Sequence, residues 1–180
     1  YKQWREGLQK GRFYRGRTFG EGAHESVLSQ SVGNQMEWTC VSEDQTRAVG
    51  MLMQKLVVPN TQYHSYQAKG LKPDARYHFY NRSLKYNIKD FGDLVNTVSP
   101  VHIRQDSLAL DLIARFKKMD GEIEDCHAAG DMLMYHGVKL KQAFGGTGYN
   151  NEVRYFQDFA ARMYFMEEEK GHADSGEAEK

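Results

Sequence analysis

Alternating apolar and polar side chains recur along this chain and predict a β-rich fold. Residues 36–42 place Met36, Trp38 and Cys40 on one face of an extended segment and Glu37 and Thr39 on the other. This period-two pattern is typical of a strand. Residues 47–58 are mostly apolar, so we expect a longer strand that pairs with residues 36–42 as an antiparallel hairpin. Further strands are expected at residues 12–17, 63–67, 75–80, 138–144, 152–156 and 160–166.

Turn-forming residues separate these segments and favour a sandwich of short strands. Residues 69–74 include a glycine and a proline and predict a turn. Two Gly-Asp units, Gly92-Asp93 and Gly130-Asp131, each precede a short apolar turn. In both units we expect the glycine to adopt a positive φ and the aspartate to cap a helical turn. The predicted fold class is therefore mainly β, an antiparallel and Greek-key-like β-sandwich.

Two stretches have helical periodicity instead. Tyr1, Trp4 and Leu8 form a stripe that Gly11 closes. Because this pattern is already running at the first residue, we expect the natural chain to continue upstream. Residues 106–118 form the second helix, capped by Asp106 or Ser107 and laid against or beside the sheet. Its apolar stripe is Leu108, Leu112 and Phe116.

These elements suggest an organisation in three parts. A helix occupies residues 1–11, and a β-sandwich domain occupies residues 12–166. Residues 167–180 are acidic, rich in small residues and without apolar periodicity, so they are expected to form a disordered tail.

Charge and composition exclude several functions. Lys plus Arg and Asp plus Glu both total 24, so the net charge is zero and binding to nucleic acid is not expected. No segment approaches the roughly 20 apolar residues of a membrane span, and we expect neither a membrane partner nor a signal peptide. Cys40 and Cys126 are too few for a disulfide framework. They fit a reducing compartment or ordinary buried positions, and we expect a cytoplasmic protein.

Candidate chemistry is sparse, and no catalytic, cofactor-binding or metal-binding residue is expected. Gly145-Gly146-Thr147-Gly148 favours a turn over a phosphate cradle because no Lys-Ser/Thr follows it. Cys126-His127 is the only adjacent Cys-His pair, and no second ligand cluster has metal spacing. Acid–base roles for Asp93 and Asp131 are less favoured than capping. The histidines are scattered, at His24, His64, His78, His102, His127, His136 and His172.

The aromatic residues admit two interpretations. At strand period they are more often core residues, but some could form a platform that stacks on sugar, with Tyr63 and Tyr66 as candidates. An exposed aromatic patch could instead serve for docking to another domain or subunit. The aromatics considered are Tyr63, Tyr66, Tyr77, Phe79, Tyr80, Tyr149, Tyr155, Phe156 and Tyr164.

Several motifs, in order, give the chain a family resemblance. Gly11-Arg12-Phe13-Tyr14-Arg15 and Trp38-Thr39-Cys40-Val41-Ser42-Glu43-Asp44 resemble segments that follow the barrel in bacterial α-galactosidases of glycoside hydrolase family 36. The run Lys69-Gly70-Leu71-Lys72-Pro73 continuing to Tyr77, and Ala129-Gly130-Asp131-Met132-Leu133-Met134 followed by Gly137, are similar to later motifs of that family. Residues 140–150 and Arg162-Met163-Tyr164-Phe165 look like its last strands. The resemblance spans about residues 1–168.

This resemblance implies a C-terminal antiparallel β-sandwich behind a (β/α)₈ catalytic barrel. Such enzymes remove terminal α-galactosyl residues from melibiose- and raffinose-type sugars with retention, using two barrel aspartates whose motifs this chain lacks. Residues 1–11 would then be the last barrel helix. The stretch at about residues 86–126 is longer than the usual pattern of the family, so the resemblance implies a helical insertion in the sandwich there.

Three hypotheses follow from these patterns. The favoured one is a non-catalytic accessory domain whose partner is the catalytic barrel of the same polypeptide, with further subunits of a homo-oligomer left open. The alternative is a stand-alone carbohydrate-binding module. A small independent hydrolase would need a cleft with paired carboxylates, which the sequence does not suggest.

Overall fold

The structure is a computed structural model that describes residues 2–18, 35–56, 65–104, 107–121, 123–141 and 159–169. Several sequence predictions lie outside the described residues. They are the turn at residues 145–148, the strand at residues 152–156, the platform candidate Tyr63, and the part of the predicted tail beyond Glu169.

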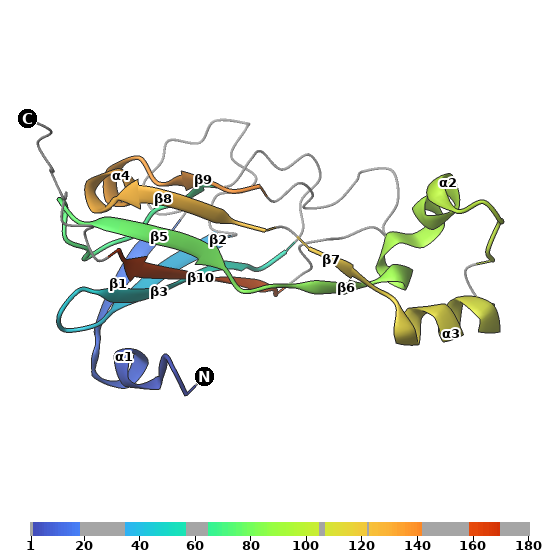
Figure 1. The fold of residues 1–180 in the computed structure, drawn as a ribbon, viewed down its shortest axis with the longest axis horizontal. Coiled ribbons are helices and arrows are strands. Elements are labelled where there is room, and N and C mark those ends of the chain that lie inside the picture. The colour runs from blue at the N-terminus through green and yellow to red at the C-terminus, as the bar shows by residue number, and fades with distance from the viewer. Residues whose placement is uncertain are drawn as a thin grey trace, which may run out of the picture.

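A six-stranded antiparallel sheet forms the centre of the fold (Figure 1), with the order β1-β2-β3-β10-β5-β8. The last strand in sequence, β10, lies between β3 and β5, so the order is not that of a simple meander. The prediction of a mainly β, antiparallel, sandwich-like fold is confirmed. The strands are β1 (Arg12–Thr18), β2 (Gln35–Val41), β3 (Arg47–Gln54), β5 (Arg76–Asn81), β8 (Asp125–Ala129) and β10 (Ala161–Glu168).

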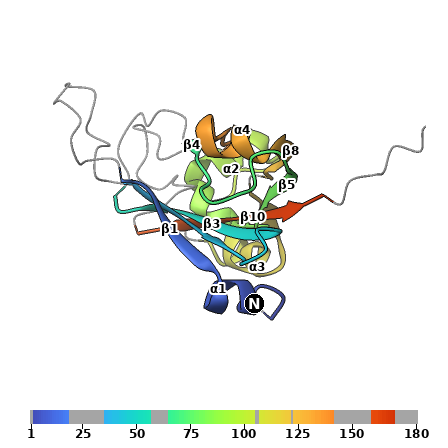
Figure 2. The ribbon, with the colours of Figure 1, turned by 90° about the vertical axis from the view of Figure 1, so that its left-hand side faces the viewer.

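A smaller second layer covers one face of this sheet, which we call the inner face. It consists of β4 (Ser65–Tyr66), paired with β9 (Val138–Lys139), and of α4 (Gly130–Tyr135). The short helix α1 (Arg5–Lys10) lies on the opposite, outer face, as both views show (Figures 1 and 2). The core between the two layers contains Val41, Ala48, Leu52, Tyr66, Ala68, Leu71, Tyr77, Phe79, Leu133, Leu140, Tyr164 and Met166.

The predicted hairpin is present, with β2 and β3 paired from Gln35↔Gln54 to Val41↔Ala48. Its polar face is the inner one. Glu37 and Thr39 are 2% and 0% exposed, whereas Met36 on the outer face is 40% exposed. The hydroxyl of buried Tyr66 explains part of this arrangement, because it lies 2.6 Å from Thr39 Oγ1 and so gives that polar side chain a partner.

Residues 85–104 and 107–120 form an arm that extends away from the sheet (Figure 1). A short ribbon of β6 (Lys85–Asn87) and β7 (Lys118–Asp120) connects the arm to β5 and β8. The arm also contains the 3₁₀ segment η1 (Ile88–Leu94) and the helices α2 (Val95–Val98) and α3 (Leu108–Phe116). The predicted helical segment is therefore a distinct structural unit, while its status as an insertion stays a prediction.

The prediction for α3 was right about its start and wrong about its packing. Ser107 is the N-cap, and its side chain accepts a hydrogen bond from Leu110 N at 3.2 Å. The helix contacts η1 in the arm and does not lie on the sheet. Its buried residues are Leu110 and Ala114, and the predicted apolar stripe of Leu108, Leu112 and Phe116 is exposed.

The Gly-Asp units also differ from expectation. In the first unit, Gly92 has the predicted positive φ, at 52°. In the second unit, Gly130 does not have a positive φ, and the nearby Gly137 has one instead, at 75°. Asp131 is not the cap of α4, because Ala129 occupies that position without a side-chain bond. Asp93 lies inside η1, where its carboxylate accepts a hydrogen bond from the Asn96 side chain at 2.7 Å.

The predicted tail begins too early, because Glu167 and Glu168 belong to β10. Cationic groups hold this segment in place. Lys72 Nζ lies 2.8 Å from Glu168, and Arg76 Nε lies 2.9 Å from Glu169. The acidic composition had suggested disorder, but the three described acidic residues face basic partners or strand neighbours.

None of the helices in the described part of the chain has the length and apolarity needed to cross a lipid bilayer.

Candidate functional site

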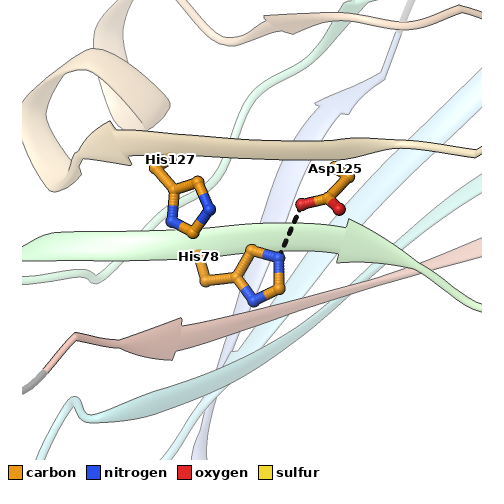
Figure 3. A group of neighbouring side chains, drawn as sticks. All are labelled: His78, Asp125 and His127. Atoms are coloured by element: carbon orange, nitrogen blue, oxygen red, sulfur yellow. Dashed lines mark hydrogen bonds and ion pairs between the residues drawn. The ribbon is translucent and has the colours of Figure 1, made fainter.

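Three potential metal ligands, His78, Asp125 and His127, gather on the outer side of β5 and β8 (Figure 3). His78 and His127 are directly opposite each other in the antiparallel register. Asp125 lies two residues before His127, so it points to the same side of β8. One ligand atom from each residue lies within 4.8 Å of the others.

The cluster is held together by short polar contacts. His78 Nε2 lies 2.7 Å from Asp125 Oδ1, and the two imidazole rings stack with centroids 4.6 Å apart. Glu169, just beyond β10, contacts His127 Nδ1 and is itself paired with Arg76. The side chains are partly exposed, at 35% for His78, 60% for Asp125 and 46% for His127, so the group is open to solvent.

A separate cleft of about 490 Å³ lies between α1 and the β2–β3 hairpin. Its carboxylates include Glu6, which is paired with Lys10 at 3.0 Å, and Asp44. Hydrogen bonds from Ser42 and Thr46 lower the pKa of Asp44 to about 2. A retaining glycosidase needs one carboxyl that stays protonated to act as an acid, and Asp44 is unsuited to that role.

The sequence of the chain matches the protein-family model described as "Glycosyl hydrolase family 36 C-terminal domain". The match covers residues 35–166, which is well over half of the chain.

The chain belongs to this family.

Solved structures share the fold of this family 36 domain. The α-galactosidase of Lactobacillus brevis aligns with 96% of the chain at a TM-score of 0.53 and 22% identity. A variant of the Geobacillus stearothermophilus α-galactosidase AgaA, in complex with raffinose, aligns with 94% at a TM-score of 0.50 and 20% identity. The chain spans only 16% and 14% of these two structures, respectively. No curated protein matches the chain by sequence.

In this family 36 domain, the sequence pattern alone does not indicate the histidine cluster. The only pair noted there, Cys126-His127, is divided between two faces of β8, because adjacent strand residues point in opposite directions. Cys126 packs against the core. Its burial raises the pKa of its thiol. The sequence signal that could have indicated a metal site is the Asp125-x-His127 spacing. That His78 lies beside these two residues follows only from the register of β5 and β8.

Among the residues that the structure describes, the aromatics considered for sugar stacking are mainly core residues. Tyr66 is 1% exposed, so this candidate for a sugar-stacking platform is wrong. The Tyr66 ring instead makes tilted contacts with the rings of Phe79 and Tyr164, whose centroids are 6.0 and 5.0 Å away. Tyr77, Phe79 and Tyr164 are also buried, and Tyr80 is half-buried on the outer face.

One end of the domain's inner face is polar. Arg162 Nη2 donates a hydrogen bond to Tyr86 Oη at 2.7 Å, and Gln35 Nε2 donates one to Gln54 Oε1 at 3.4 Å. Glu124 accepts a bond from the Lys141 backbone N–H. Buried groups bonded in this way are typical of a structural network that fixes strand register.

Proposed function

We propose that this chain is a non-catalytic accessory domain that packs on the catalytic part of a longer α-galactosidase polypeptide. The observation that carries the proposal is an apolar patch on the outer face of β1, β2 and β3. Three large side chains there, Phe13, Met36 and Met53, are 56%, 40% and 39% exposed. A contiguous exposed apolar surface of this kind is typical of a docking site.

The strand register makes these residues neighbours. Met36 lies opposite Met53, and Trp38 lies opposite Met51. The ring centroids of Phe13 and Trp38 are 5.4 Å apart. We define the outer-face patch as Phe13, Met36, Trp38, Met51 and Met53. Its aromatic and methionine content matches the composition of protein interface cores.

Helix α1 supports the choice of partner, because it already lies on the outer face. The rings of Trp4 and Phe165 have centroids 4.8 Å apart, and the Arg47 guanidinium lies 5.9 Å from the Trp4 ring centroid. The polypeptide upstream of α1 is therefore positioned to meet the same face. The small share of the related α-galactosidases that the chain spans leaves room for a large catalytic partner.

We assign the chemistry to that partner. Retaining hydrolysis of a terminal α-galactosyl group requires two carboxyls about 5–5.5 Å apart, one as nucleophile and one as acid and base. The raffinose bound to the Geobacillus enzyme indicates the class of substrate that we expect for the polypeptide carrying this domain. The domain would stabilise the catalytic part and cover its apolar surface.

Activity assays with an aryl α-galactoside test this proposal. The chain alone is expected to give no turnover, and Trp38→Glu in the complete polypeptide is expected to reduce the amount of soluble, active enzyme several-fold. A charge buried at the interface without a partner is strongly unfavourable. Tyr135→Glu, at a 74% exposed position on α4, is the control and should leave activity unchanged.

Turnover by the chain alone, or equal activity of the Trp38→Glu and Tyr135→Glu enzymes, would overturn the proposal. Calorimetry of the chain with melibiose addresses the alternative of a carbohydrate-binding module. Saturable binding there, together with full activity of Trp38→Glu, would favour that alternative.

A further inference from the structure

We propose that His78, Asp125 and His127 bind a divalent transition-metal ion of the zinc type on the outer face of β5 and β8, with Glu169 orienting His127. This inference goes beyond the docking role, since it concerns the other end of the sheet and does not require the catalytic partner.

The backbone places the ligands without any rearrangement. β5 and β8 are paired through Arg76↔Ala129 to Tyr80↔Asp125, which puts His78 and His127 opposite each other on the same side. In Figure 3 a ring nitrogen of His127 and the bonded nitrogen of His78 both point toward the Asp125 carboxylate. Three donors from two hydrogen-bonded strands therefore converge on one region.

The donor set is chemically suited to zinc. Two imidazole nitrogens and one carboxylate form the set found in catalytic and mixed zinc sites, and imidazole also favours copper and nickel. Ligand atoms about 2.0–2.1 Å from a shared tetrahedral ion lie about 3.3 Å from each other. His78 Nε2 and Asp125 Oδ1 are already at 2.7 Å, and the widest separation in the cluster is within 4.8 Å. Rotation of the exposed His127 and Asp125 side chains suffices to bring all three donors onto the ion.

Glu169 supplies the support that metal-binding histidines usually have. Its carboxylate contacts Nδ1 of His127, which leaves Nε2 as the nitrogen that can bind metal. Glu169 is fixed in turn by Arg76 at 2.9 Å and by its backbone N–H, which donates to Arg76 O at 2.8 Å. This contact thus fixes which nitrogen of His127 is free for metal before any ion binds.

The local charge also favours a cation. The carboxylates around the cluster are Asp125, Glu169 and Glu167, and Glu167 lies opposite both His78 and Arg47 in the register. The positive groups near these three carboxylates are the two arginines Arg47 and Arg76. With neutral imidazoles the site carries an excess of one negative charge, which attracts a divalent ion.

Metal binding would have a clear structural effect. Among the described strands, β8 is at the edge of the sheet and is bonded on one side to β5. An ion shared by His78 and His127 would cross-link these two strands and resist opening of the edge.

Isothermal titration calorimetry of the 180-residue chain with ZnCl₂ tests the proposal. We expect saturable binding of a single Zn²⁺ and a higher melting temperature in its presence. His78→Ala and His127→Ala are each expected to weaken the binding at least about tenfold, and Asp125→Asn is expected to weaken it while preserving side-chain shape. His102→Ala, which removes an exposed histidine in the arm, should bind as the unmodified chain does.

Melting curves without metal verify that each variant is folded. If His78→Ala or His127→Ala does not fold, the zinc affinity of Asp125→Asn becomes the deciding measurement. No heat of binding by the unmodified chain would overturn the proposal. So would equal zinc affinity in the double variant His78→Ala/His127→Ala, because the ion would then reside on other histidines. Neither result bears on the activity assay of the docking proposal.

Discussion

Tyr66→Ala is expected to lower the free energy of unfolding of the chain by about 3–5 kcal/mol, the usual cost of removing a large buried aromatic ring. The ring is 1% exposed and lies between the two layers. A Cβ on Gly50 would come within 2.1 Å of the Tyr66 hydroxyl, so the sheet approaches the ring closely. Urea unfolding followed by the fluorescence of Trp4 and Trp38 measures the loss.

The Tyr66 hydroxyl joins a chain of hydrogen bonds. It donates to Trp38 O at 3.0 Å, so its single proton is used and Thr39 Oγ1, 2.6 Å away, must be the donor to it. Burial raises the pKa of this phenol well above its ordinary value, so it stays protonated. Tyr66→Phe is therefore expected to cost about 1–3 kcal/mol, less than the alanine variant.

The double variant Tyr66→Ala/Gly50→Ala separates the effect of the cavity left by the ring from the effect of the close approach of Gly50 to it. Gly50→Ala alone should be destabilising, because its methyl group has no room beside the ring. In the Tyr66→Ala background that space is open, and the added cost of Gly50→Ala should largely disappear. A Tyr66→Ala chain within about 1 kcal/mol of the unmodified one would contradict the placement of this ring in the core.

Gly130→Ala is expected to destabilise the chain by about 1–3 kcal/mol through overpacking. A Cβ at this position would lie 2.0 Å from the Lys72 carbonyl oxygen, which belongs to the backbone and cannot rotate away. Gly130 N donates to Ala75 O at 2.8 Å, so the two segments are tied together at this point. Thermal or urea unfolding measures the change.

Gly7→Ala is the matched control for this substitution. A Cβ on Gly7, in α1, would meet nothing within 4 Å. Since alanine favours a helix over glycine, this variant should be neutral or more stable by up to about 1 kcal/mol. Equal stability of Gly130→Ala and Gly7→Ala would show that the backbone near Lys72 does not pack as the structure has it.

Local sequence patterns predicted part of this fold, and the Gly130 unit shows where such prediction ends. Period-two alternation located the β2–β3 hairpin because strand patterning is local, and the expected cap at Asp106 or Ser107 located the start of α3 for the same reason. The importance of the Gly130 unit was visible, but its cause was mistaken. Its glycine is required by the approach of Lys72, a contact between distant segments, and positive φ falls at Gly137 instead.

The failures share a physical origin in tertiary packing. Alternation in β2 could not reveal that Thr39 faces inward, since that depends on the Tyr66 hydroxyl from another strand. The stripe of α3 was correctly recognised as apolar but is exposed in the arm. His78 and His127 are brought together only by the pairing of β5 with β8, which the sequence spacing does not indicate.

The docking of the outer-face patch is tested most directly by methionine oxidation. Met36 and Met53 are 40% and 39% exposed in this chain, and Met132 on α4 is 54% exposed. Peroxide converts accessible methionine to the sulfoxide, which peptide mass spectrometry quantifies. All three should be oxidised in the chain alone. In the complete α-galactosidase polypeptide, Met36 and Met53 should be protected several-fold while Met132 reacts as before; unchanged oxidation of Met36 and Met53 would contradict docking through this face.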